Sequence, residues 1–243
     1  MRVEARPAFY ALAPGGWRDY VTLLHPPYTA WHLSYVVMGA TLAPVVAWDR
    51  LLLGLLAFFL ATGVGAHALD ELHGRPLRTR IPDRVLWTLA VTAIAGAVAL
   101  GVYACVAYTL WLVPCVAFGA VVVVAYNLEL LGGIVHGDVW FALAWGGLPA
   151  LTGYLGEAGR VSDEALALVA FATLLSAAQR VLSRPVRDVR RQVAAVEGTV
   201  ERRDGRREAL GPRSLIGAPE TALRLLSAAS VVLALALVLA RAT

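Results

Sequence analysis

Histidines and carboxylates are the residues of this sequence whose types and spacing could do chemistry. All five histidines fall within the first 140 of its 243 residues, and several have acidic neighbours. His67, Asp70 and Glu71 are related by i,i+3 and i,i+4 spacing, so they share one face of a helix. Asp70 and His73 have the i,i+3 spacing that helix-bundle metal sites use for a carboxylate and a histidine. Neutral imidazole combined with carboxylate suits iron, zinc or manganese.

The composition is that of a membrane protein. Hydrophobic residues make up 59% of the chain and charged residues only 16%, whereas soluble domains are about a quarter charged. We therefore expect an all-α integral membrane protein with one transmembrane domain over residues 1–243. Seven segments are long and apolar enough for a helix that crosses a hydrocarbon core of about 30 Å. They are approximately 28–47, 51–72, 84–104, 106–126, 138–156, 163–183 and 219–240.

Arginines set the expected orientation. All 21 basic residues are arginine, with four between the second and third spans and ten between Arg180 and Arg213. The positive-inside rule places both loops in the cytoplasm, with the N-terminus inside and the C-terminus outside. The cytoplasmic ends of the first, second, fourth and fifth spans then share one layer. We expect a transition-metal site there, most plausibly of one or two iron ions, with ligands from His32, His67, Asp70, Glu71, His73, Glu129 and His136.

Other residues near this layer have alternative roles. Tyr28 and Tyr35 belong to a polar-aromatic face of the first span, and with Arg75 they are the candidate catalytic residues. His25 precedes the first span, and its position favours an interfacial hydrogen-bonding role. Asp138 is placed to cap the fifth span. Asp70 and Glu71 have an alternative as well, because each could cap a helix end or pair with the arginines of the following loop.

The Arg-rich stretch 184–214 has its own pattern. Valines recur there at spacings of three and four, which predicts an amphipathic helix lying at the lipid headgroups. The alternative is a lid over the cytoplasmic mouth of the site. Nucleic acid is not an expected partner, because no aromatic residues are interleaved with the arginines. The expected partners are the lipid bilayer and a hydrophobic or small-molecule substrate, and the oligomeric state stays open.

Two stretches resemble the UbiA superfamily of membrane prenyltransferases. The segment from His67 to Pro82, HALDELHGRPLRTRIP, is similar to that family's first Asp-rich motif and the turn after it. The segment from Gly133 to Leu155, with Gly-Asp and then WGGLPALTGY, resembles the fifth helix of the naphthoate polyprenyltransferase branch, and Tyr126 fits a tyrosine of that branch. The resemblance implies a UbiA-like helical bundle, a polyprenyl diphosphate substrate bound through Mg²⁺, and a phosphate contact for Arg75.

The departures from this pattern change the expected chemistry. Asp70 and Glu71 are the remaining acids of the first motif, histidines stand nearby, and the second acidic motif is replaced by QRVLSRPVR. Because Mg²⁺ prefers oxygen ligands, a site rich in imidazole favours a transition metal. We therefore expect a metal-dependent oxidoreductase, with zinc-dependent hydrolysis also possible. The alternatives are a divergent Mg²⁺-dependent prenyltransferase and a non-catalytic protein that binds a lipid or quinone. Close packing is expected at Gly146, Gly147 and Gly153.

Overall fold

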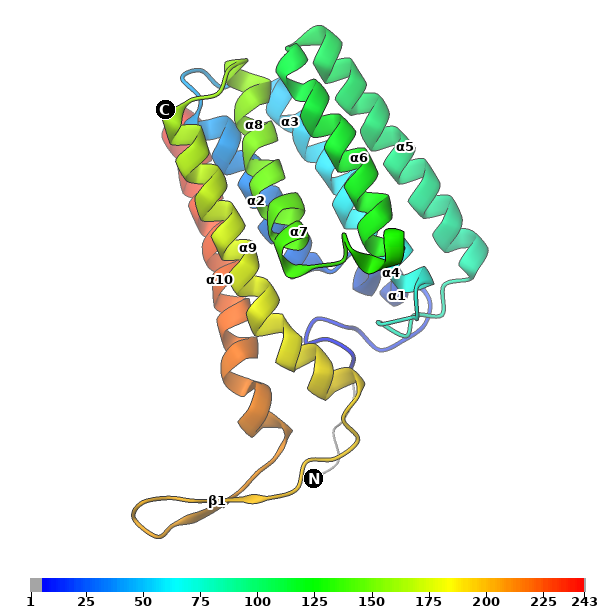
Figure 1. The fold of residues 1–243 in the computed structure, drawn as a ribbon, viewed down its shortest axis with the longest axis vertical. Coiled ribbons are helices and arrows are strands. Elements are labelled where there is room, and N and C mark those ends of the chain that lie inside the picture. The colour runs from blue at the N-terminus through cyan, green and yellow to red at the C-terminus, as the bar shows by residue number, and fades with distance from the viewer. Residues whose placement is uncertain (1–5, 243) are drawn as a thin grey trace.

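The structure is a computed structural model, and it describes residues 6–242 of the chain. Helices dominate this part, with one short two-stranded hairpin near the end (Figure 1). The elements in chain order are α1 (Trp17–Leu23), α2 (Pro26–Leu42), α3 (Trp48–Phe58), η1 (Phe59–Ala66), α4 (His67–Leu72), α5 (Asp83–Ala107), η2 (Leu110–Leu112), α6 (Val113–Asn127), η3 (Leu131–Gly133), α7 (Asp138–Ala142), η4 (Leu143–Gly147), α8 (Leu148–Ala158), α9 (Asp163–Arg191), β1 (Thr199–Glu201), β2 (Arg207–Ala209) and α10 (Pro212–Ala242).

Several of these helices join end to end into longer rods. Within the described residues, five rods are long and apolar enough to cross a membrane, judged by length and composition. They are Trp48–Leu72, Asp83–Ala107, Leu110–Asn127, Asp163–Arg191 and Pro212–Ala242. An all-α architecture with apolar spans is thus confirmed.

The expected number of seven spans is wrong, because the segments 28–47 and 138–156 do not qualify. The first corresponds to α2, which has only 17 residues and buries the polar side chains of Thr29, His32 and Ser34. The second is divided into α7, η4 and α8, of 5, 5 and 11 residues. Both segments contribute to the interior of the bundle.

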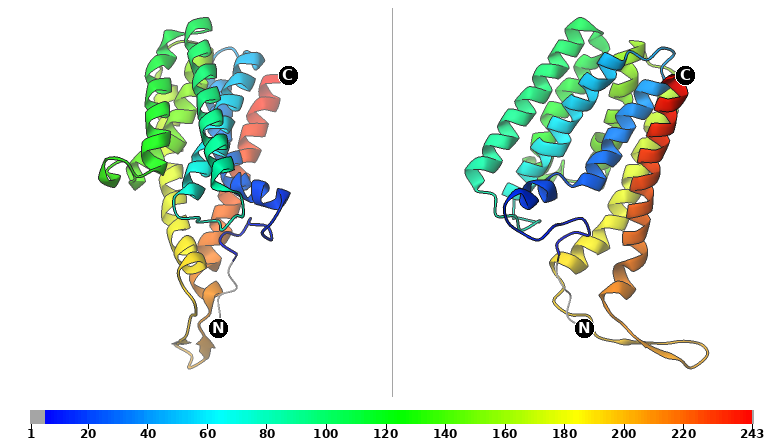
Figure 2. Two further views of the ribbon diagram at one scale, coloured as in Figure 1. Left: turned by 90° about the vertical axis from the view of Figure 1, so that its right-hand side faces the viewer. Right: turned by 180° about the vertical axis from the view of Figure 1, so that it is seen from behind.

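The rods lie side by side in an alternating up-and-down arrangement (Figures 1 and 2). α2 packs most extensively on α8 and α10, and α10 also packs on α9. On the other side of the bundle, α5 packs against η1, α4 and α3. The start of α2, the end of α4 and the start of α7 therefore meet at one end of the bundle, which is the lower end in Figure 1.

Glycines allow the closest of these helix contacts. A Cβ atom at Gly39 of α2 would overlap the carbonyl oxygen of Ala150 in α8, and one at Gly153 would overlap the carbonyl oxygen of Val36. Gly146 and Gly147 face α9 in the same way. The prediction that glycines of the fifth segment are close-packing positions is therefore confirmed.

The Arg-rich segment differs from its prediction. α9 continues to Arg191, and Val186 and Val189 are buried in the core beside Ile216 of α10. These valines therefore face the bundle and not the lipid headgroups. After α9 the chain forms the β1–β2 hairpin, in which Thr199 pairs with Ala209. The hairpin projects beyond the bundle, so the expected amphipathic helix is confirmed over 184–191 and wrong over the hairpin (Figure 1).

We predict that Gly153→Ala destabilises the bundle. The added methyl group meets the backbone of α2 and forces the two helices apart, and overpacking of this kind costs about 1–3 kcal/mol. Gly156→Ala is the matched control, because a Cβ atom at that position meets nothing within 4 Å. Thermal unfolding in detergent should show a lower midpoint for Gly153→Ala and an unchanged or higher one for Gly156→Ala. Equal midpoints would mean that the α2–α8 contact is looser than described.

Candidate functional site

A polar chamber of about 300 Å³ lies at the end of the bundle where α2, α4 and α7 meet. All five histidines line it, and so do Asp70 and Glu129. Tyr28, Tyr126 and the arginines Arg180, Arg187 and Arg191 complete its polar wall. Side chains far apart in the sequence are thus brought to one place.

The histidines of the chamber are oriented by oxygen atoms of the bundle. The Nδ1 atom of His67 lies 3.1 Å from the carbonyl oxygen of Gly63, within the π-helical segment η1. The Nδ1 atom of His136 lies 2.9 Å from the carbonyl oxygen of Tyr126. A carbonyl oxygen only accepts, so both Nδ1 atoms carry a hydrogen. Donation from Nδ1–H to a carbonyl oxygen, with Nε2 turned to the ion, is the arrangement found in metal-binding histidines.

His32 is held by an amide in the same manner. Its Nε2 atom lies 3.1 Å from Oε1 of Gln179 in α9, so Nε2 donates and Nδ1 keeps its lone pair. Among the described residues, that Nδ1 atom is buried without a hydrogen-bond partner, and so are Nε2 of His25 and the hydroxyl of Tyr126. Three buried polar atoms without partners beside one chamber indicate a polar occupant, because such atoms are nearly always hydrogen-bonded in folded proteins.

Glu129 lies between two of the histidines. Its Oε1 atom is 3.8 Å from Nε2 of His73 and 3.9 Å from Nε2 of His136. Glu129 follows α6 in the chain. Its backbone φ is +49°, a left-handed conformation that is uncommon outside glycine. The carboxylate and the two imidazole nitrogens are therefore close enough for small side-chain movements to bring all three to one cation.

Two charged side chains of the chamber lack partners in the described part of the chain. The Asp70 side chain forms no hydrogen bond or ion pair there, and neither does the Arg187 side chain, although Arg187 and Arg191 act electrostatically on Asp70. Half-buried charges without direct partners are costly. The chamber therefore has capacity for both a cation at Asp70 and an anionic group at Arg187.

These side chains do not form a preassembled metal cluster. Within residues 6–242, no group of three or more His, Cys, Asp and Glu side chains is close enough together to hold a metal ion. The closest approach to such a group is Glu129 with its two histidines. The side chains of His73 and Glu129 are about half exposed, at 52% and 46%, so both have room to change rotamer.

Glu71 does not face the chamber, so its predicted role as a ligand is wrong. Its carboxylate is completely buried and accepts hydrogen bonds from the backbone N–H groups of Leu77 and Thr79 and from the Thr79 hydroxyl. These bonds fold the loop after α4. The i,i+4 spacing from His67 correctly placed Glu71 on a shared helix face, but the loop closes over that part of the face.

Two of the candidate catalytic residues are also structural. Tyr35 is buried in the core, where its hydroxyl accepts a hydrogen bond from Nε1 of Trp31 and contacts Ser176. Arg75 donates to the carbonyl oxygens of Thr79 and Ile81 and forms an ion pair with Asp83. Neither lines the chamber, whereas Tyr28 does.

Asp138 and His25 differ from their predicted roles too. Asp138 forms ion pairs with Arg180 and Arg184 of α9, and its side chain makes no capping hydrogen bond. His25 stacks on His67 with ring centroids 3.9 Å apart, and its φ is +46°. Burial and the neighbouring His67 hold the pKa of His25 well below its usual value, so its ring is neutral. The left-handed backbone that turns His25 inward has no signal in the sequence.

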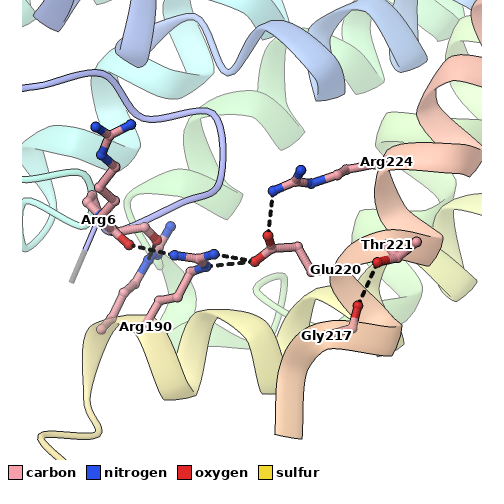
Figure 3. Close-up of polar contacts among 8 residues, drawn as sticks. Arg6, Arg190, Gly217, Glu220, Thr221 and Arg224 are labelled. Carbon is pink, nitrogen blue, oxygen red and sulfur yellow. Dashed lines mark hydrogen bonds and ion pairs between the residues drawn. The ribbon is translucent and has the colours of Figure 1, made fainter. Parts of the chain in front are cut away.

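The N-terminal residues 7–10 form one wall of the chamber, and we call residues 6–12 the strap. Glu220 of α10 organises its attachment, because it accepts from Arg190 at 2.5 Å and from Arg224 at 2.6 Å (Figure 3). Arg190 also donates to the carbonyl oxygen of Arg6, and the Arg224 guanidinium lies 4.7 Å from the ring centre of Phe9. A buried carboxylate thus positions two arginines that hold the strap over the chamber.

A second cavity, of about 130 Å³, lies deeper in the bundle among α2, α3, α5, α6 and α8. Its walls are mainly small apolar residues. Trp145 lines both this cavity and the polar chamber, and its ring stacks on Phe141. Trp145 is thus shared by the walls of an apolar and a polar space.

Comparison with known proteins assigns this chain to no family. No family model matches it, and no curated protein or solved structure is significantly similar to it. The functional argument therefore depends on the geometry of the chamber.

We predict that Glu71→Gln loosens the loop over residues 73–82. A Gln side chain presents an NH₂ group where the carboxylate accepts from backbone N–H groups, and an unsatisfied buried donor costs about 1–3 kcal/mol. Trypsin should cleave after Arg78 and Arg80 faster in this variant than in the wild type. Glu201→Gln, at an exposed hairpin position, is the control. Unchanged cleavage in Glu71→Gln would contradict the structural role.

We predict that Glu220→Gln releases the strap. Loss of the charge-assisted hydrogen bonds to Arg190 and Arg224 should accelerate chymotrypsin cleavage after Phe9 and Tyr10 about tenfold, which corresponds to roughly 1.4 kcal/mol. The matched control is Glu208→Gln, since Glu208 also pairs with an arginine, Arg202, but in the exposed hairpin. Equal cleavage rates in the two variants would show that Glu220 does not hold the strap.

Proposed function

We propose that this protein is a membrane-embedded, metal-dependent enzyme whose catalytic centre is the polar chamber. One observation carries the proposal: the Glu129 carboxylate lies 3.8 and 3.9 Å from the Nε2 atoms of His73 and His136. A small movement of these side chains would bring one carboxylate oxygen and two imidazole nitrogens to a single cation. Imidazole nitrogen and carboxylate oxygen are ligands that iron, zinc and manganese accept together.

Two further features of the chamber support a bound metal ion. The hydrogen bonds from His67 and His136 to backbone carbonyl oxygens fix the tautomers that leave Nε2 available. Asp70 adds an unpaired carboxylate to the same chamber, and its negative charge balances part of the charge of a divalent ion. His25 packs on His67 as a neutral ring, so it adds no positive charge beside the ion, and the cationic side chains of the chamber are Arg180, Arg187 and Arg191.

The chemistry proposed for this centre is oxidation or oxygenation, with iron as the preferred ion. A bound transition metal would supply Lewis acidity or one-electron chemistry. The chain's own groups have separate tasks. Asp70 can accept a proton from a substrate, Arg187 can pair with an anionic group, and the strap and Trp145 restrict the entry of water. Hydrolysis is the corresponding reaction if the bound ion is zinc.

The proposed membrane orientation places the chamber at the cytoplasmic face. The support is the arginine distribution, because the loop after α4 and the segment between α9 and α10 lie at the same end of the bundle as the chamber (Figure 1). The N-terminus would then be cytoplasmic, and the C-terminus outside. The proposed fold relationship is to the UbiA superfamily, supported by the motif-like segments at residues 67–82 and 133–155.

We predict that purified protein contains a stoichiometric transition metal and that His136→Ala and Glu129→Gln lower its affinity more than about tenfold. Asp138→Asn is the control, because that carboxylate is already paired with two arginines. Metal content by elemental analysis and competition with a chelator measure the effect. Absence of transition metal from carefully purified wild-type protein would overturn the proposal. Full affinity in both His136→Ala and Glu129→Gln would also overturn it.

Asp70 and His67 extend the same test. We expect Asp70→Asn to weaken metal binding more than Asp138→Asn, because the Asp70 charge has no other partner in the described part of the chain. His67→Ala should weaken it as well, whereas Glu71→Gln should retain the ion. Normal loading in Asp70→Asn, with loss in Asp138→Asn, would contradict this assignment of the two aspartates.

A second candidate function is transfer of a prenyl group from a diphosphate. The observation in its favour is that Trp145 lines both the apolar cavity and the polar chamber, while Arg187 faces the chamber without a carboxylate partner among the described residues. An isoprenoid tail and a diphosphate would fit these two spaces. Mg²⁺-dependent turnover of a polyprenyl diphosphate, lost in both Asp70→Asn and Arg187→Gln, would establish this function. Binding of a lipid or quinone without turnover would place the protein in a non-catalytic class.

A further inference from the structure

The segment between α6 and α7 exposes apolar side chains next to the chamber. Leu130 is 44% exposed and Ile134 75%, and Val139 and Trp140 at the start of α7 are also exposed. In the left view of Figure 2 this segment projects sideways from the bundle. We call residues 128–140 the flap. Much of this apolar surface is therefore left uncovered by the described residues.

The flap is nevertheless an ordered turn. The N–H of Leu130 donates to the carbonyl oxygen of Ala125, that of Gly133 to Glu129, and that of His136 to Gly133. Gly132 and Gly133 have positive φ values, which glycine adopts without strain and which allow the chain to reverse. These bonds hold the turn so that Glu129 and His136, on one side of it, line the chamber. Ile134, on the opposite side of the turn, faces outward.

The outward side of the flap continues a lipid-facing surface. It follows directly on the apolar span Leu110–Asn127, whose Val121 is 68% exposed. The Trp140 ring stacks near Phe118 of that span, at 6.3 Å between centroids. Arg184, which is 65% exposed and paired with Asp138, lies beside the flap. Tryptophan and arginine next to apolar residues are typical of the boundary between acyl chains and headgroups.

We propose that the flap inserts into the bilayer interface, with Leu130, Ile134 and Val139 among the phospholipid acyl chains just below the headgroups. The partner is therefore a phospholipid surface. Because the opposite side of the same turn carries Glu129 and His136, lipid contact holds two chamber side chains in place. The bilayer thus becomes a structural component of the chamber. This inference is independent of whether the chamber holds a metal.

A fluorescence experiment measures the depth of the flap. In a Cys105→Ala, Cys115→Ala background, Ile134→Cys is labelled with an environment-sensitive fluorophore and reconstituted into phosphatidylcholine–phosphatidylglycerol nanodiscs. Phospholipids with a nitroxide near the top of the acyl chain serve as quenchers. Val200→Cys is the matched control, because Val200 is also exposed but lies in the projecting hairpin. Insertion by about 5–10 Å should make quenching at least about threefold stronger at position 134 than at position 200.

Several results would overturn the proposal. Equal quenching at the two positions would show that the flap lies in water. Efficient disulfide cross-linking between two Ile134→Cys chains would show that a second copy, and not lipid, covers the surface. Leu130→Cys provides a second labelling position if Ile134→Cys gives no folded protein, and the same outcomes apply to it.

Amide exchange tests the link from lipid to chamber. Ile134→Glu should withdraw the flap from the acyl chains and weaken the turn, so the backbone amide of His136 should exchange with deuterium about tenfold faster than in the wild type. Val200→Glu is the control and should leave this amide unchanged. Unchanged exchange at His136 in Ile134→Glu would show that lipid contact does not support the chamber.

Discussion

Close approach of α2 to α8 is the contact on which the chamber depends. Helix backbones come this near only where side chains are absent, as at Gly39 and Gly153. The contact fixes α2 in the middle of the bundle, and α2 carries Tyr28 and His32 to the chamber wall. α8 continues from η4, which carries Trp145. A small separation of the two helices would therefore alter the polar chamber and the apolar cavity together.

The acids of this end of the bundle divide into two groups by their partners. Glu71 and Glu220 are buried and satisfied, one by backbone N–H groups of a loop and the other by two arginines. Their role is to close the chamber with loop and strap. Asp70 and Glu129 face the chamber, and the histidines near Glu129 approach without forming a close hydrogen bond. A buried carboxylate that is fully hydrogen-bonded has little capacity for another cation, so chemistry is left to the second group.

The chamber combines histidines that are oriented by uncharged oxygen atoms with charged side chains. Carbonyl and amide oxygens select the ring tautomers of His32, His67 and His136. The charged side chains of the chamber are Asp70, Glu129 and the arginines of α9, which come from other elements. Such a division lets a bound ion or anionic group complete the charge balance. The chamber also depends on the flap, because Glu129 and His136 belong to this turn, whose outer side is apolar and exposed.

The sequence alone determined that the protein is helical with apolar spans, and it placed four of the chamber's five histidines and two of its acids at one end. The lengths of the apolar runs predicted the helical spans, because this signal is local. Helix periodicity and an alternating topology then predicted a shared end of the bundle for His32, His67, Asp70, His73, Glu129 and His136. Tertiary structure alone decided which acids stay free, since that depends on the loop that covers Glu71 and on the α9 arginines that reach Asp138. It also decided that His25 turns inward and that residues 6–12 close the chamber. Those features arise from contacts between segments as much as 184 residues apart in sequence, which no local pattern encodes.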